Sequence, residues 1–299
     1  MTINFWASVL AGSILSATSV LYATLGEVIE QRAGIVNLGL EGIILMGAVA
    51  GFAVAARTGD ATLAVLAAAL AGVLFNMIFG FLVITCRANQ LASGLALMFC
   101  GFGLSALLGT DYVGSQIDGL AAIRLPFIRS GIFDYDILVY LVVPVAVLVY
   151  LMLYHTRFGL RLRATGENAA AAFAAGLNPT VLRYEALILG GLLGGLGGAH
   201  LSLAFTKTWA EGMSAGRGFI AVALVIFSKW HPLRAIFGAL LFGGAVALQL
   251  QLQARGARIS PFLLDMLPYL LSLGVLLVWG GSRRHTAPAG LGQVYRGTE

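Results

Sequence analysis

Two polar side chains lie inside an apolar segment that we predict over residues 35–56. Asn37 and Glu41 are four residues apart, so on one continuous helix they would share a face. An ionisable side chain is costly inside a membrane helix, and it usually faces a bundle interior or a watery path. Two interpretations stay open at this point. The pair either lines a polar path or gate through the membrane, or it holds neighbouring helices together by hydrogen bonds.

Three charged residues precede this segment. Glu27, Glu30 and Arg32 fall between the apolar runs predicted over 3–25 and 35–56. We expect them to form a charged collar outside both segments, because charged side chains are rare within membrane-spanning helices.

A basic, polar stretch over residues 157–183 separates two long apolar segments. Within it, Gly166 and Asn168 are expected to break the chain and cap a short helix over Ala169–Ala175. Gly176 and Asn178–Pro179 are typical of a helix end. Phe173 is the one bulky side chain of this helix, so the helix is thin enough to enter a groove of another protein. Burial on lipid is the alternative, but the helix has few bulky apolar residues for it.

The amino-acid composition indicates the fold class. The chain has 299 residues, of which 59% are hydrophobic and only 10% are charged. Soluble domains usually carry about 25% charged residues, so the composition excludes a large soluble core. We predict an all-α, polytopic transmembrane bundle of about eight to ten membrane helices. The net charge of +5 is scattered over loop ends, which fits contact with membrane lipid and argues against nucleic acid as a partner.

We predict nine membrane segments. They cover residues 3–25, 35–56, 61–85, 91–109, 136–155, 185–205, 219–229, 233–253 and 262–280. The seventh is a candidate half-helix, because its eleven residues reach only about half of a 30 Å hydrocarbon core. We expect one membrane domain over residues 1–282 and a tail over 283–299 on the same side as the 157–183 stretch.

The distribution of basic residues suggests an orientation. If all nine segments cross and the 157–183 stretch is cytoplasmic, the inner loops carry eleven of the 18 Lys and Arg residues and the outer loops carry seven. This modest excess follows the positive-inside rule. It places the tail inside and the N-terminus outside.

Other polar or small residues have simpler explanations. Gly190, Gly194 and Gly198 follow a small-xxx-small spacing, which allows close helix crossing. We expect the single histidine beside them, His200, to be a hydrogen-bonded interior group rather than a ligand.

The sequence contains no nucleotide-binding motif of the form G-x-x-x-x-G-K-[ST] and no H-E-x-x-H motif of a zinc protease. The four histidines share no metal-ligand spacing, and the two cysteines form no C-x-x-C pair, so we expect no metal site. The chain is therefore not expected to be an enzyme. If the chain takes part in a process driven by ATP, another chain must hydrolyse the ATP.

Four stretches together resemble a known family. They are GEVIEQRAGIVNLGLEGIILMGA (26–48), ATGENAAAAFAAGLN (164–178), GRGFIAVALVIFSKWHP (216–232) and the C-terminal LPYLLSLGVLLVWG with APAGLGQVY. Nearly the whole chain is similar to the inner-membrane permeases of bacterial ABC importers for nucleosides and simple sugars, within the branched-chain amino-acid/ribose permease superfamily. Its length and tail look like the second of two unlike permeases in nucleoside importers.

The resemblance implies a function, a location and partners. The chain would be a multi-pass permease subunit of the bacterial inner membrane, moving nucleosides by alternating access. It would work with a second permease, a cytoplasmic ATP-binding protein and an extracytoplasmic substrate-binding protein. It would hold no cofactor itself, with ATP and Mg on the partner ATPase.

The resemblance also implies site residues. A coupling helix docking on the ATPase would include Gly166, Glu167, Asn168, Ala171, Ala172 and Gly176. The translocation path would be lined or braced by Asn37 and Glu41, and also by Gln90 and Ser93 at the start of the fourth segment.

A secondary transporter driven by protons or sodium is the alternative function. It would need intramembrane carboxylates and broken helices in two corresponding halves. Glu41 and Asp265 are candidate carboxylates, but the sequence has no clear internal repeat.

Overall fold

The computed structural model of the chain describes residues 2–123, 134–256 and 287–294, together with Ser260 and single positions between 263 and 277. The described part is built from helices. They are α1 (Thr2–Arg32), α2 (Leu40–Thr58), α3 (Ala61–Gly80), α4 (Gln90–Gly109), α5 (Ile137–His155), α6 (Arg157–Glu167), α7 (Ala169–Ala174), α8 (Pro179–His200), α9 (Arg217–Phe227) and α10 (Pro232–Ala254). Single π-helical turns extend α3 over Phe81–Thr85 and α8 over Leu201–Phe205.

Seven of the described helices are long and apolar enough to cross a membrane. They are α1 to α5, α8 and α10, with α3, α4 and α8 lengthened by the turns that follow them. This confirms the all-α, multi-pass fold class. The predicted seventh segment corresponds to α9, whose 11 residues make it a short helix. The predicted ninth segment, with Asp265, lies largely outside the described residues.

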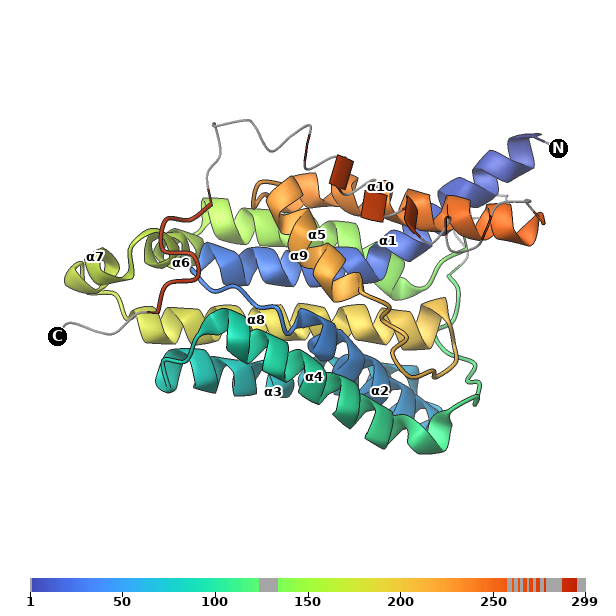
Figure 1. The fold of residues 1–299 in the computed structure, drawn as a ribbon, viewed down its shortest axis with the longest axis horizontal. Helices are drawn as coiled ribbons and strands as arrows, with labels where there is room; N and C mark the ends of the chain where they lie inside the picture. Colours follow the sequence, from blue (N-terminus) through green and yellow to red (C-terminus); the bar gives the residue numbers. More distant parts are fainter. Residues whose placement is uncertain are drawn as a thin grey trace.

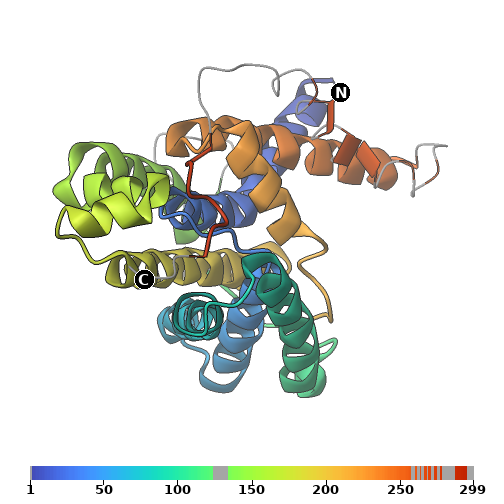
Figure 2. The ribbon, with the colours of Figure 1, turned by 60° about the vertical axis from the view of Figure 1, so that its left-hand side comes forward.

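The long helices form one bundle around α1 and α8 (Figures 1 and 2). Helix α1 packs against α10 and α8, and α8 packs against α3 and α2. Helices α2, α3 and α4 lie on one side of this central pair, and α5 and α10 lie on the other (Figure 1). Helices α6 and α7 and the C-terminal segment lie at one end, which we call the α7 end. The N-terminus lies at the opposite end.

The connection between α1 and α2 differs from the prediction. Helix α1 continues to Arg32, so Glu27 and Glu30 lie on its last turns and are fully buried, rather than forming a collar outside it. Helix α2 begins only at Leu40. Residues 33–39, which we call the α1–α2 connector, run back from the α7 end toward the middle of the molecule without helical structure (Figure 1). Asn37 therefore does not share a helix face with Glu41.

The glycines of α8 allow close packing on two sides, which confirms their predicted role. A Cβ on Gly198 would overlap the Ile44 carbonyl oxygen of α2, and a Cβ on Gly195 would overlap the Ala68 carbonyl oxygen of α3. Without bulk at these positions, the backbones of α8, α2 and α3 approach closely, which favours association of membrane helices.

We predict that Gly195→Ala destabilises the bundle by about 1–3 kcal/mol, because the added methyl group forces α3 and α8 apart. Gly244→Ala on α10 is the matched control, since its Cβ would meet only the Ser13 hydroxyl oxygen, at an ordinary 3.5 Å. Thermal unfolding of both variants in detergent measures the difference. Equal melting temperatures would show that the α3–α8 contact is looser than the structure indicates.

Candidate functional site

Glu41 caps the N-terminus of the short helix α9. Its Oε1 accepts hydrogen bonds from the Ser214 hydroxyl at 2.6 Å and the Gly216 N–H at 2.7 Å. Its Oε2 accepts one from the Gly218 N–H. These N–H groups have no partner within α9, and the positive end of the helix dipole favours a carboxylate beside them. Glu41 is only 1% exposed, so this carboxylate joins the start of α2 to the start of α9 inside the protein.

A second buried polar cluster surrounds Asn37. The Asn37 Nδ2 group donates to Glu30 Oε2 at 3.2 Å and to Asn76 Oδ1 at 2.8 Å. The Asn76 Nδ2 group donates to Glu30 Oε1 at 2.6 Å and to the Leu187 carbonyl oxygen at 2.7 Å. The cluster thereby ties the connector to α1, α3 and α8.

The same cluster bonds the backbone of the connector. The Asn37 N–H donates to Glu27 Oε1 at 3.2 Å, and the Gly39 N–H donates to Asn37 Oδ1 at 2.9 Å. The Ala33 carbonyl oxygen accepts from Arg183 Nε at 3.3 Å. Peptide groups that leave a helix inside an apolar bundle need such partners, because an unpaired one costs several kcal/mol. The buried polar side chains therefore permit the connector to exist.

The C-terminal end of α9 is held as well. The Trp230 indole N–H donates to Gln31 Oε1 at 2.7 Å, and Gln31 Nε2 donates to Glu27 Oε1 at 2.7 Å. The Trp230 carbonyl oxygen accepts from Arg32 Nε at 3.2 Å. Helix α9 is thus fixed at one end by Glu41 and at the other by the end of α1.

The two residues predicted on the fourth segment are buried at the start of α4. Gln90 contacts the connector directly, since its Oε1 accepts from the Val36 N–H at 2.9 Å. Its Nε2 donates to the Gln293 carbonyl oxygen at 3.3 Å. Ser93 is buried one turn further along, and its neighbour Gly94 approaches the backbone of Leu38 and Gly39 in the connector. Asn37 and Gln90 therefore meet at the connector, and Glu41 follows it at the start of α2.

The stretch over 157–183 contains more helix than predicted. Residues 157–167 form α6, which the sequence reasoning treated as loop. The short helix that follows, α7, is close to the predicted one. The Asn168 side chain caps it by accepting from the Ala171 N–H at 2.9 Å, and Gly176 follows it with φ +83°. Asn178 and Pro179 begin α8.

The six residues predicted for coupling face two ways. Gly166 and Ala172 are buried, and a Cβ on Gly166 would overlap the Arg32 carbonyl oxygen. The absence of a side chain at Gly166 is therefore required by packing within this chain. The exposed members are Glu167, Asn168, Ala171 and Gly176, and exposed Phe173 lies among them.

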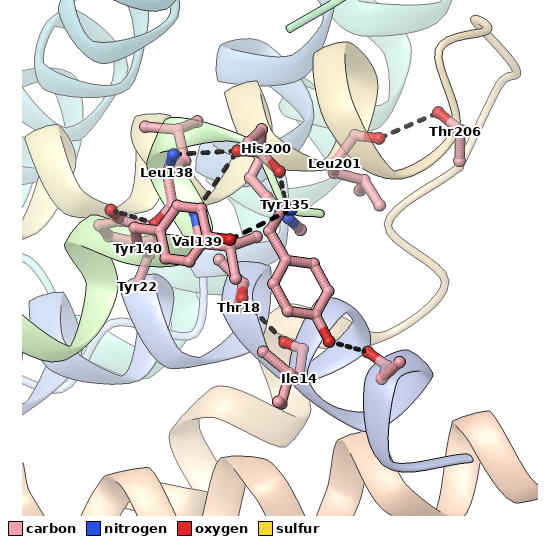
Figure 3. Close-up of polar contacts among 12 residues, drawn as sticks. Ile14, Thr18, Tyr22, Tyr135, Leu138, Val139, Tyr140, His200, Leu201 and Thr206 are labelled. Carbon is pink, nitrogen blue, oxygen red and sulfur yellow. Dashed lines mark hydrogen bonds and ion pairs between the residues drawn. The ribbon is translucent and has the colours of Figure 1, made fainter. Parts of the chain in front are cut away.

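A separate polar cluster lies at the N-terminal end of the bundle, where His200 and Tyr135 lie close together (Figure 3). The Asp136 Oδ1 atom caps α5 by accepting from the Leu138 N–H at 2.9 Å. Burial raises the pKa of the Asp136 carboxyl, and the helix N–H bonds and the charge of Lys207 oppose the shift. Asp136, Tyr135 and Lys207 also line a cavity of about 250 Å³.

His200 differs from its prediction. It is fully buried, but neither ring nitrogen has a hydrogen-bond partner among the described residues. The Asp136 Oδ2 atom lies 3.9 Å from the His200 Nε2 atom, which is beyond hydrogen-bond distance. The interior position was predicted correctly and the hydrogen bonding was not. No group of three or more His, Cys, Asp or Glu side chains suited to a metal ion occurs in the described part of the chain.

The sequence analysis predicted no role for Asn76, Gln31 or Trp230 in these clusters. Asn76 interrupts the apolar segment 61–85 in the way that Glu41 interrupts its own, so the same signal was available. Gln31 and Trp230 carry no such signal, because their roles depend on where α9 ends in space.

Together, the seven long helices and the enclosed polar clusters define a polytopic helical membrane protein. Comparison with known proteins gives the family. Residues 8–279 match the model of the branched-chain amino acid transport system / permease component family. The chain belongs to this family of permease components.

Three similar proteins align with this chain over most of their own length. The chain is 40% identical to the putative glucose ABC transporter permease protein TsgC13 of Haloferax volcanii, over 86% of this chain and 82% of that protein. It is 34% identical to the nucleoside ABC transporter permease protein NupC of Lactococcus lactis, over 93% and 94%. It is 31% identical to the guanosine ABC transporter permease protein NupQ of Bacillus subtilis, over 96% of each. A second Bacillus subtilis guanosine permease, NupP, is 28% identical over 78% of this chain.

We predict that Glu41→Gln lowers transport more than it lowers the amount of protein in the membrane. A glutamine amide presents N–H donors where the carboxylate accepts from three donors, so about 2 kcal/mol of capping should be lost. Uptake divided by membrane content is the measurement. Glu211→Gln is the control, because it neutralises an exposed carboxylate on the loop before α9. Equal loss of uptake and of protein would assign Glu41 a purely structural role.

Proposed function

We propose that this chain is the permease subunit of an ATP-driven importer in the plasma membrane, and that it moves nucleosides by alternating access. Family membership and relatives named as ABC transporter permeases over almost their whole length support this. The observation that carries it is the exposed, thin helix α7 at one end of the bundle. Helix α7 directly follows the end of α6, which contacts the connector that leads to the buried polar clusters.

The α7 end is the cytoplasmic end in this proposal, where the ATP-binding partner docks. The exposed face of α7 offers small side chains around Phe173, which is 47% exposed. A rigid apolar side chain on a thin helix suits insertion into a groove of another protein. ATP and Mg belong to that partner, which hydrolyses the ATP.

The connector is the proposed route from α7 to the membrane interior. Gly166, at the end of α6, contacts the backbone of Arg32 and Gly34 where the connector begins. The connector leads through the Asn37 cluster to Glu41, which holds α9. A displacement of α7 would therefore move the start of α2 and the short helix α9 together, through backbone contacts and buried hydrogen bonds rather than through loose side chains.

The remaining partners are a second permease and an extracytoplasmic substrate-binding protein. Two guanosine permeases of Bacillus subtilis, NupQ and NupP, are both relatives of this chain. That pair supports a complex of two unlike permeases. The cavities at the N-terminal end, of about 250 Å³ and about 470 Å³, lie on the face assigned here to the binding protein.

Two relatives support nucleosides as the substrate, but the one that is 40% identical is a putative glucose permease. Glucose is therefore the second candidate. Both ligands present a ring with several hydroxyl groups. A competition assay must therefore separate nucleosides from glucose as the substrate.

A secondary transporter is not favoured. The matched family comprises permease components of transport systems, and the named relatives are ABC transporter permeases. Glu41, which that alternative required as an intramembrane carboxylate, is occupied in capping α9.

Uptake by the reconstituted complex tests the proposal. We expect labelled nucleosides to accumulate only when this chain, a second permease, the ATP-binding protein and the binding protein are all present with ATP. The chain alone should neither hydrolyse ATP nor concentrate substrate. Uphill uptake by the chain alone, driven by a proton or sodium gradient, would overturn the proposal. Accumulation of glucose or ribose in place of nucleosides would change only the substrate.

We predict that arginine has different effects at two adjacent alanines of α7. Ala171→Arg adds bulk and charge on the exposed face, so it should leave the melting temperature unchanged and reduce co-purification of the ATP-binding protein. Ala172→Arg places a charge at a buried position and should lower the melting temperature by itself. Exposed Ala121→Arg at the N-terminal end controls for the added charge. Full co-purification and uptake with Ala171→Arg would remove α7 from the docking surface.

A further inference from the structure

The C-terminal segment over residues 287–294, which we call the tail strap, is packed onto the α7 end of the protein. Pro288 and Gly290 are buried, and Ala287 and Leu291 pack against the main hydrophobic core. The strap makes up most of the APAGLGQVY stretch that is similar to the family, and coupling through α7 alone gives it no role.

Four hydrogen bonds join the tail strap to three separate elements. The Gly290 N–H donates to the Gly166 carbonyl oxygen at 2.9 Å, and the Ala289 N–H donates to Glu167 Oε2 at 3.0 Å. The Gly292 N–H donates to the Gly34 carbonyl oxygen at 3.2 Å. The fourth is the Gln90 side chain, which donates to the Gln293 carbonyl oxygen at 3.3 Å. The strap thus touches the end of α6, the connector and the start of α4.

Three glycines meet backbone to backbone where the strap packs: Gly34 of the connector, Gly166 of α6 and Gly290 of the strap. A Cβ on Gly34 would lie 3.3 Å from both the Gly166 Cα and the Gly290 carbonyl oxygen. A Cβ on Gly290 would lie 2.8 Å from the Gly166 carbonyl oxygen. Contacts of this kind leave little room for sliding, because packed backbones are not continuously deformable. A displacement of Gly166 would therefore be passed to the strap and the connector at once.

We propose that the tail strap positions the end of α6 against the connector, so that movement of α7 reaches α2 and α4 together. The inference rests on the proposed function, since it gives a role to coupling between α7 and a partner ATPase. The strap is a positioning element, because it acts through the end of α6, the connector and α4. Gln90 gains a specific role in this arrangement, since its amide bridges the Val36 N–H of the connector and the strap.

The test separates coupling from simple stability. Gly290→Val should push the strap away from Gly166, whereas Gly103→Val is the matched control, because a Cβ on Gly103 meets no atom within 4 Å. In the reconstituted complex we expect Gly290→Val to keep basal ATP hydrolysis and to lose stimulation by the loaded binding protein by at least about fivefold, the lower end of usual coupling between sites.

A second pair of variants protects the test against misfolding. Glu167→Gln keeps an oxygen that can accept from the Ala289 N–H, and Glu167→Ala removes it. Stimulation retained in Glu167→Gln and lost in Glu167→Ala supports the proposal, even where Gly290→Val fails to assemble. Full stimulation in both Gly290→Val and Glu167→Ala overturns it. Equal loss of stimulation in Gln and Ala variants, with full stimulation in Gly290→Val, also overturns it.

A cross-link distinguishes failure of the strap from failure of the proposed function. Cysteines at positions 167 and 289, in a chain with the exposed Cys86 and Cys100 replaced by alanine, should be joined in native membranes by a short bifunctional reagent. Peptide mass spectrometry detects the joined pair. A cross-link in a complex without ATP-driven uptake would count against the transport proposal alone. Normal uptake without a cross-link would count against the strap.

Discussion

The structure depends on how the chain satisfies its peptide groups where it leaves a helix inside an apolar bundle. In the connector over residues 33–39, only the N–H groups of residues 33–35 donate to carbonyl oxygens of α1. The later ones need other partners, because an unpaired peptide group away from water costs several kcal/mol. Glu27, Asn37 and Gln90 supply the missing partners for its N–H groups. These side chains explain why carboxylates and amides occur in segments that are otherwise apolar. Apolar residues in their place would leave the N–H groups of Val36, Asn37 and Gly39 without these partners inside the bundle.

The connector also creates the start of α2 at Leu40, and with it the position of Glu41. Because α2 begins near the middle of the molecule, Glu41 can reach the N-terminus of α9 and take up its N–H groups (Figure 1). The short helix α9 requires this cap, because without it the N–H groups at its start would be unpaired donors within the bundle. Close packing of glycines on α8 brings α2 and α3 near enough for Asn76 to complete the cluster.

The sequence was sufficient to predict the helical, multi-pass fold, because length and apolarity alone identify a membrane helix. It also predicted α7 well, since Asn168 and Gly176 are strong local signals for a cap and a helix end. It placed the break between α1 and α2 wrongly. The connector follows from partners that lie far away in sequence, such as Asn76 and Gln90, and no local pattern reports them. The burial of Ala172 was missed for the same reason, because a short helix does not reveal which face meets its own chain.

The central claim is that the connector links α7 to the short helix α9. Its most direct test is a distance measured by electron paramagnetic resonance between nitroxide labels at Phe219 on α9 and Leu63 on α3, both exposed positions. The labels are placed in the assembled complex, with Cys86 and Cys100 replaced by alanine, and the resting and nucleotide-trapped states are compared. The account predicts a shifted distance on trapping that is lost in Asn37→Ala, while basal ATP hydrolysis continues. An equal shift with and without the Asn37 side chain would contradict it.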